Sequence, residues 1–407
     1  MTAPTRRPLA VWLAGCLAGS VALLSGCDPS SQTPSENTTA STGDVRVSEV
    51  WRVENLPRTA SVFLRSGRVV AAGEVEDGAD DVLVVLDEAT GALEWQHSLR
   101  SPTDDPDAVP LVSERIQIVS ATDGVYLSTF SLSNQADPIL GYALNTGKRL
   151  FPPVHDEDEW RVQESFVGAT TGGLVTDVGI IRDPVSGLPT RVKTVPGSVV
   201  AVAGTVGFSW RITDPVLTGY DITTDEELWN IQIDERPDVI VLDPGHVVVA
   251  DQTSWRLVDV ATGDATPLPG AGGPNTFGTV SACAGNEFQV VPVSRSTPPV
   301  SCDGRFVGFI ERGRLEILDT QTAQVADIAV CNPTTLPFTV QDGLVLCASG
   351  SESSSLALRI LDAATGFQIA RFEDPNLLGA TGMAFLGSRL VLTFADGTFV
   401  GYDVTRI

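Results

Sequence analysis

Apolar and polar residues alternate along most of this chain in short runs, and each run leads into the same kind of polar turn. Residues 81–86, Asp-Val-Leu-Val-Val-Leu, are a typical run, and the turn Asp-Glu-Ala-Thr-Gly at 87–91 follows directly. Alternation with a period of two indicates a half-buried β-strand, and Asp, Thr and Gly stabilise a tight reversal. A second strand containing Trp95 follows. The pattern therefore predicts an antiparallel hairpin.

This hairpin recurs along the chain. The position of Asp87 is filled in the other copies by Ala143, Asp183, Asp221, Asp259, Asp319, Asp362 and Asp403. Successive copies are on average about 45 residues apart, which is the length of one four-stranded propeller blade. The sequence thus predicts an all-β fold, an eight-bladed β-propeller of four-stranded antiparallel blades. Seven blades is the alternative, because the copy at Asp183 is poor.

The two ends of the repeat region complement each other. The last copy stops at Ile407, before the outermost strand of its blade. Residues Ser48–Leu56, which include Trp51, are similar to the strands that follow the turns at Asp87 and Asp221. We expect this N-terminal strand to complete the C-terminal blade, because such closure removes a free sheet edge.

The first 26 residues have the pattern of a bacterial lipoprotein signal peptide. Arg6 and Arg7 precede an uncharged apolar stretch, and Leu-Ser-Gly-Cys at 24–27 has the form of a lipobox. Cys16 also fits this form, but a shorter apolar stretch precedes it. We expect Cys27 to be the lipidated residue after export by either the general secretory or the twin-arginine route.

Residues 27–45 and 46–407 then form a tether and a propeller. The tether has almost no apolar residues, so it cannot bury enough apolar surface to offset the loss of conformational entropy on ordering. We therefore expect it to be flexible. The whole chain has 26 Lys and Arg against 51 Asp and Glu. Nucleic acid is not an expected partner, because binding it requires a basic surface. Anionic lipids would also repel this body, which leaves the lipid on Cys27 as the expected membrane contact.

Four cysteines follow the tether, and an even number in an exported chain suggests disulfides. They are Cys283, Cys302, Cys331 and Cys347. Three pairings are possible, and we favour Cys283–Cys302 with Cys331–Cys347 because each pair spans one local reversal of the chain. Their spacing contains no CxxC and no nearby His, so no metal site is expected.

The sequence suggests no catalytic, cofactor-binding or metal-binding residue. Of the three histidines, His97 is interpreted as a packing residue and His246 as part of a turn. His155 precedes the acidic run 156–159, which we interpret as a solvated loop. The chain has no GxSxG, HExxH or GxxxxGK[ST] motif. Trp51, Trp95 and Trp229 are expected to pack one blade against the next.

The eleven residues from Val85 to Trp95 resemble the tryptophan-docking motif of the PQQ-type β-propellers. Residues that match it are Asp87, Thr90, Gly91 and Trp95 in the first copy, Asp221, Thr224 and Trp229 in the fourth, and Asp259, Gly263, Asp362 and Gly366 in two weaker copies. Asp225 stands where the family has Gly. The resemblance implies a propeller from Ser48 onward. Quinoprotein dehydrogenases and scaffold lipoproteins of the BamB type share this fold.

The sequence favours the scaffold over the dehydrogenase, because these dehydrogenases carry an adjacent Cys-Cys pair that is missing here. We expect a non-catalytic lipoprotein, without a cofactor, on the extracytoplasmic face of the cell membrane. It would bind an envelope protein through a propeller face, with segments 74–81, 101–109, 131–138 and 285–302 as candidate interaction loops. Alternatives are a propeller that binds a small ligand or glycan and, less favoured, a PQQ-dependent dehydrogenase.

Overall fold

The computed structural model describes strands and turns that cover most of the repeat region. The described residues are 40–41, 45–74, 81–99, 116–121, 123–129, 139–151, 166–170, 173–193, 196–233, 235–251, 254–268, 281–282, 288–293, 301–311, 314–331, 338–349, 357–373, 377 and 380–406. No α-helix occurs among these residues, and none of them forms a helix that could cross a membrane. Residues 36–407 form one compact unit.

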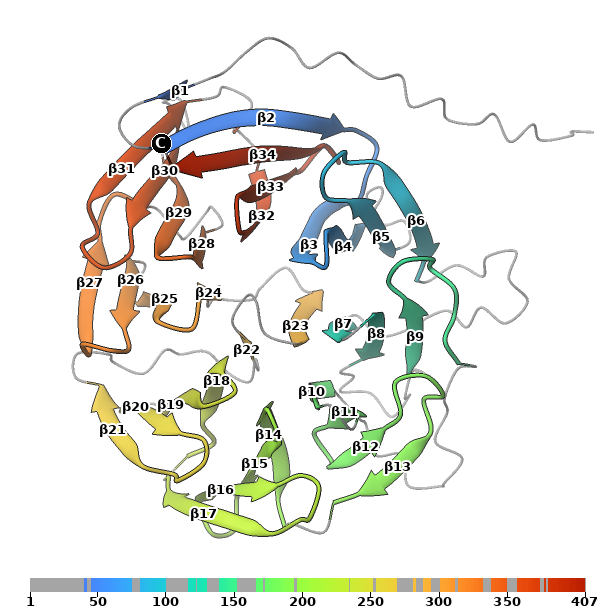
Figure 1. Cartoon of the computed structure of the whole chain (residues 1–407), viewed down its shortest axis with the longest axis vertical. Coiled ribbons are helices and arrows are strands. Elements are labelled where there is room, and N and C mark those ends of the chain that lie inside the picture. The colour runs from blue at the N-terminus through green and yellow to red at the C-terminus, as the bar shows by residue number, and fades with distance from the viewer. Residues whose placement is uncertain are drawn as a thin grey trace, which may run out of the picture. The chain divides into compact units, whose positions relative to one another are not determined.

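The described strands form eight sheets arranged in a ring (Figure 1). Blade 1 consists of β3 (Arg58–Arg65), β4 (Arg68–Glu74), β5 (Asp81–Asp87) and β6 (Leu93–Ser98), and blade 2 of β7 (Ile116–Ala121), β8 (Gly124–Thr129) and β9 (Leu140–Ala143). Blade 3 consists of β10 (Phe166–Thr170), β11 (Gly173–Thr176), β12 (Ile180–Arg182) and β13 (Pro189–Val192), and blade 4 of β14 (Ser198–Ala203), β15 (Val206–Arg211), β16 (Val216–Asp221) and β17 (Glu227–Gln232).

The second half of the ring follows the same plan. Blade 5 consists of β18 (Asp238–Asp243), β19 (His246–Ala250), β20 (Trp255–Asp259) and β21 (Ala265–Leu268), and blade 6 of β24 (Ser301–Cys302), β25 (Phe306–Glu311), β26 (Arg314–Asp319) and β27 (Gln324–Ile328). Blade 7 consists of β28 (Phe338–Gln341), β29 (Leu344–Ser349), β30 (Ala357–Asp362) and β31 (Gln368–Glu373). Blade 8 combines β32 (Ala380–Leu386), β33 (Arg389–Phe394) and β34 (Phe399–Arg406) with β2 (Val45–Val53). The predicted β-propeller is confirmed, and each of the eight turn copies lies in a sheet of its own.

The N-terminal strand closes the ring as the sequence predicts. β2 pairs antiparallel with β34, from Val45 opposite Arg406 to Val53 opposite Phe399. The short strand β1 (Ala40–Ser41) then pairs with β2 and becomes a fifth strand of blade 8. The last blade therefore takes its outermost strand from the other end of the chain.

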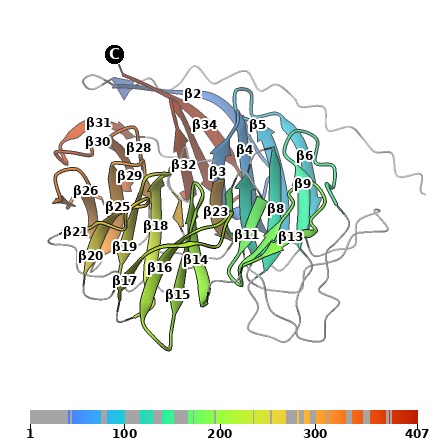
Figure 2. The same cartoon turned by 60° about the horizontal axis from the view of Figure 1, so that its bottom comes forward.

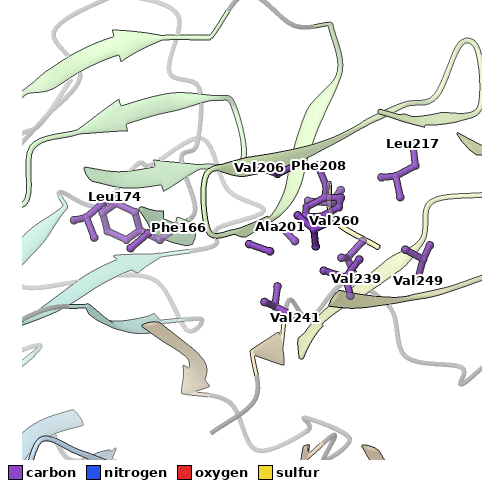
Figure 3. Close-up of a cluster of buried hydrophobic side chains, with 14 of the residues drawn as sticks. Phe166, Leu174, Ala201, Val206, Phe208, Leu217, Val239, Val241, Val249 and Val260 are labelled. Carbon is purple, nitrogen blue, oxygen red and sulfur yellow. The ribbon is translucent and has the colours of Figure 1, made fainter. Parts of the chain in front are cut away.

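The core lies between neighbouring blades. Inner strands such as β14 and β18 bury consecutive residues, whereas the outermost strand β17 exposes most of its side chains. Figure 3 shows one cluster in which Phe166 of blade 3, Phe208 of blade 4 and Val239 of blade 5 take part. Full burial of such a side chain stabilises by about 1.5–3 kcal/mol, so stacking of the sheets is the main source of stability.

Strand direction defines two faces of the ring. Consecutive strands of a blade are antiparallel, so the connections from first to second and from third to fourth strand share one face. We call it the turn face, because the turn at 87–91 and its repeats lie there. The connections from second to third strand and the links between blades share the opposite face, which we call the long-loop face.

One of the two predicted disulfides is present. Cys331 and Cys347 are bonded, with their Cα atoms 5.9 Å apart. Cys302 also belongs to a disulfide. Cys283 lies outside the described residues, so the pairing Cys283–Cys302 stays a prediction.

Candidate functional site

The repeated Asp and Thr residues build the turns. Asp87 accepts hydrogen bonds from the backbone N–H of Thr90 (2.8 Å) and from its hydroxyl (2.6 Å). The hydrogen bond from the Thr90 hydroxyl lowers the pKa of Asp87, because it stabilises the carboxylate. Asp259 and Asp362 accept equivalent bonds from Thr262 and Thr365. At Asp221 the neighbouring Thr223 and Thr224 share this role. These residues are therefore structural.

Each predicted tryptophan docks on the turn of the next blade. Trp51 of blade 8 donates its indole N–H to the carbonyl of Glu88 in blade 1, at 2.8 Å. Its ring lies against Gly91, where an added Cβ would come within 2.7 Å of the Trp51 ring. Trp95 donates likewise to Leu144 (2.8 Å), and Trp229 to Val260 (2.9 Å). The predicted blade-to-blade packing of these side chains is confirmed.

Two of the three histidines are found where the sequence places them. The ring of His97 stacks on Tyr142 at 4.6 Å, and its Nε2 lies 2.7 Å from the Gly147 carbonyl. His246 pairs with Asp243 in the turn between β18 and β19, at 3.1 Å. His155 and the acidic run 156–159 lie outside the described residues, as does Cys27. Within the described part of the chain, no group of three or more His, Cys, Asp or Glu could hold a metal ion.

A buried lysine that the sequence does not indicate lies between blades 3 and 4. Lys193 is only 9% exposed, and its Nζ donates to the Ser209 hydroxyl at 3.2 Å. The same Nζ lies over the ring of Tyr220, 4.8 Å from its centre. Burial lowers the pKa of Lys193 to about 8, and the carboxylate of Asp225 opposes this effect. A lone Lys at a strand end gives no sequence signal, because burial depends on the neighbouring blade.

The centre of the ring holds two additional strands from the link between blades 5 and 6. β22 (Ser281–Ala282) runs parallel to β18, the innermost strand of blade 5. β23 (Phe288–Val293) runs antiparallel to β7, the innermost strand of blade 2, with Phe288 opposite Ala121. Figure 1 shows β23 beside β7 near the middle of the ring. The expectation that segment 285–302 is a loop is wrong over β23 and β24. β23 pairs with the inner edge of β7, and β24 pairs with β25 as the first strand of blade 6.

The strand directions indicate how this link passes through the ring. The first strand of each blade runs from the long-loop face to the turn face. β22 is parallel to such a strand and β23 is antiparallel to one. The link therefore enters the centre from the long-loop face and returns to that face.

The strands that flank three of the four candidate interaction segments meet these segments at the long-loop face. Segments 74–81 and 131–138 join the second and third strands of blades 1 and 2, and segment 101–109 belongs to the link between these blades. Segment 285–302 belongs to the link that carries β23. Residues 75–80, 101–109 and 131–138 themselves lie outside the described residues. The topology thus brings strand ends that are far apart in sequence to one face.

Comparison with known proteins adds the fold but no family. No protein-family model matches the chain, and no curated protein matches it. Among solved structures, the computationally designed Ika8 protein is 14% identical with a TM-score of 0.56, and the match covers 87% of this chain and 99% of that chain. BamB from Moraxella catarrhalis is 13% identical with a TM-score of 0.33, over 88% of this chain and 97% of that chain. At 14% identity, the match to the designed protein supports the fold alone.

Proposed function

We propose that this protein is a non-catalytic lipoprotein of the cell envelope and that it acts as a protein-interaction scaffold through its long-loop face. One observation carries the proposal: the strands that flank three of the four segments suggested for binding end at this face, and the link that carries β22 and β23 through the centre enters and leaves there. Loops held on a rigid β scaffold are a common location for binding residues. The repeated polar residues, in contrast, are engaged in turns.

Because β22 and β23 lie in the centre of the ring, we favour a protein partner that covers one face rather than a small ligand that binds on the axis. β23 pairs with β7 along its whole length, from Phe288 opposite Ala121 to Val293 opposite Ile116. A small molecule on the axis would have to compete with this backbone pairing. A protein partner can instead contact loops from several blades at once, over an interface of about 800 Å² per partner.

Site-specific photocrosslinking tests which face is used. Ile212, in the connection from β15 to β16 on the long-loop face, is 79% exposed, and Val185, in a turn of the turn face, is 66% exposed. A photoreactive residue at 212 should crosslink to an envelope protein in intact cells, and the matched residue at 185 should not. Crosslinking from 185 alone, or from neither position, would contradict the proposed interface.

Two further measurements test the other parts of the proposal. Mass spectrometry of the mature protein should show acylation at Cys27, and Cys27→Ser should abolish it. Acylation at Cys16 would contradict the proposed anchor. Incubation with PQQ and Ca²⁺ followed by a dye-linked dehydrogenase assay should give no turnover above background. Turnover would show that the protein is an enzyme.

A further inference from the structure

The chain that leads to Cys27 joins the propeller at its turn face. Asp403 lies opposite Ser48, and β34 and β2 continue past it to the pair Arg406 and Val45. β1 pairs with this extension, Ala40 opposite Val47. Because Asp403 corresponds to the turn residue Asp87, the extension projects beyond the turn face. Figure 2 shows β2 and the C-terminus together at the upper side of the ring.

Exposed apolar side chains gather on the same face. Five of the eight large apolar side chains that are exposed among the described residues lie within or directly after the repeated turns: Leu93, Val185, Leu188, Leu228 and Phe367. They belong to blades 1, 3, 4 and 7, so they are distributed around the rim. The turns occupy equivalent positions in their blades, which places these side chains at one level. Exposed apolar residues arranged in this way are typical of an interaction surface.

Several carboxylates of the turn face are engaged in hydrogen bonds or ion pairs. Besides the turn aspartates, Asp319 forms an ion pair with Arg305 at 2.7 Å, and Asp403 one with Arg389 at 3.3 Å.

From these three observations we infer that the turn face is a membrane-docking face that rests its apolar rim on the lipid interface. The long-loop face then points away from the membrane, toward its partner. This inference rests on the proposed lipid anchor at Cys27. Twelve residues, 28–39, separate Cys27 from Ala40, and this stretch of chain spans at most about 45 Å when extended. The tether keeps the rim close to the lipid, so contacts that are weak one by one act together.

Energy transfer to a labelled bilayer measures this orientation. The full-length lipoprotein is purified and placed in phosphatidylcholine vesicles that contain an acceptor lipid. A donor dye is attached at Phe367→Cys on the turn face or at Ile212→Cys on the long-loop face, which are 76% and 79% exposed as wild-type residues. Strands of six residues separate the two faces by about 20 Å. Transfer should be clearly stronger from position 367, and equal or reversed efficiencies would overturn the inference.

Charge substitutions separate docking from anchoring. Val185→Asp together with Leu188→Asp should reduce the difference in transfer between the two labelled positions, because carboxylates resist transfer into the lipid interface. Ile212→Asp is the matched control, and it should leave the difference unchanged. An unchanged difference in the double variant would overturn the role of the rim. If the wild-type lipoprotein does not bind to vesicles at all, the proposed lipid anchor at Cys27 is wrong. If it binds but transfer is equal from both labelled positions, the anchor stands and the docking of the turn face is wrong.

Discussion

Arg191 of blade 3 and Asp225 of blade 4 take the places that Trp and Gly hold at other blade junctions. Arg191 follows Asp183 by eight residues, as Trp95 follows Asp87. Its Nη2 lies 3.1 Å from the Asp225 carboxylate, and its Nη1 donates to the carbonyl of Ile222 at 3.3 Å. This carbonyl corresponds to that of Glu88, which accepts the indole N–H of Trp51. The departure from the repeat at Asp225, which has φ of 61°, is therefore matched by a second departure on the neighbouring blade.

A double-mutant cycle tests this compensation. Arg191→Trp alone should destabilise the protein, because the new ring meets the Asp225 side chain and removes the guanidinium that pairs with its partly buried carboxylate. Asp225→Gly alone should also destabilise it, because Arg191 loses its ion pair. The double variant recreates the arrangement of Trp229 on Gly263 and should recover about 1–3 kcal/mol relative to the sum of the single changes. Urea unfolding measures these free energies, and additive effects would show that the two positions are independent.

Two glycine substitutions separate backbone strain from tryptophan docking. Gly67 and Gly91 have φ of 74° and 71°, but only at Gly91 would a Cβ contact Trp51. Gly67→Ala should cost about 1–2 kcal/mol for the left-handed backbone alone. Gly91→Ala should cost about 1–3 kcal/mol more, because the Trp51 ring must move. Equal thermal midpoints for the two variants would mean that a Cβ at position 91 does not disturb the packing of the Trp51 ring.

Stability should depend on pH through Lys193. Its pKa is lowered to about 8 in the folded protein, from 10.5. Between these values the unfolded chain binds a proton that the folded protein does not, so stability rises as pH increases. Below pH 8 the buried ammonium costs on the order of 3 kcal/mol. Lys193→Met should therefore stabilise the protein at pH 7, and the advantage should shrink as pH approaches 10. Denaturant unfolding at several pH values checks the slope, and a constant difference would contradict the assignment.

Truncation tests closure of the ring by β2. A protein that begins at Val45 lacks β1 and should unfold at nearly the same urea concentration as one with the tether. A protein that begins after Leu56 lacks β2, leaves the edge of β34 unpaired and loses Trp51, so it should lose several kcal/mol and aggregate. Comparison of the two midpoints, with light scattering for aggregation, decides the point. Similar behaviour of the two truncated proteins would rule out β2 as the closing strand.

The sequence by itself determined the features that depend on neighbours along the chain or on neighbouring repeats. The period-two runs mark the strands, and Asp87 with Thr90 specifies a turn whose hydrogen bonds are local. Trp95 and Trp229 recur at the same place in their repeats, so the recurring spacing was enough to predict that they pack one blade against the next. The same reasoning placed the N-terminal strand beside β34, because one edge lacked a partner.

Only the tertiary structure decided which groups meet across the ring. Alternation can mark residues 288–293 as a strand, but it does not show which sheet edge accepts them. The edge accepted is that of β7, more than a hundred residues earlier. Loop closure becomes only slowly more costly with length, so sequence distance does not prevent such pairing. Burial of Lys193 and the level of the rim residues likewise arise from stacking of separate blades. These features depend on packing in three dimensions, which a linear pattern does not encode.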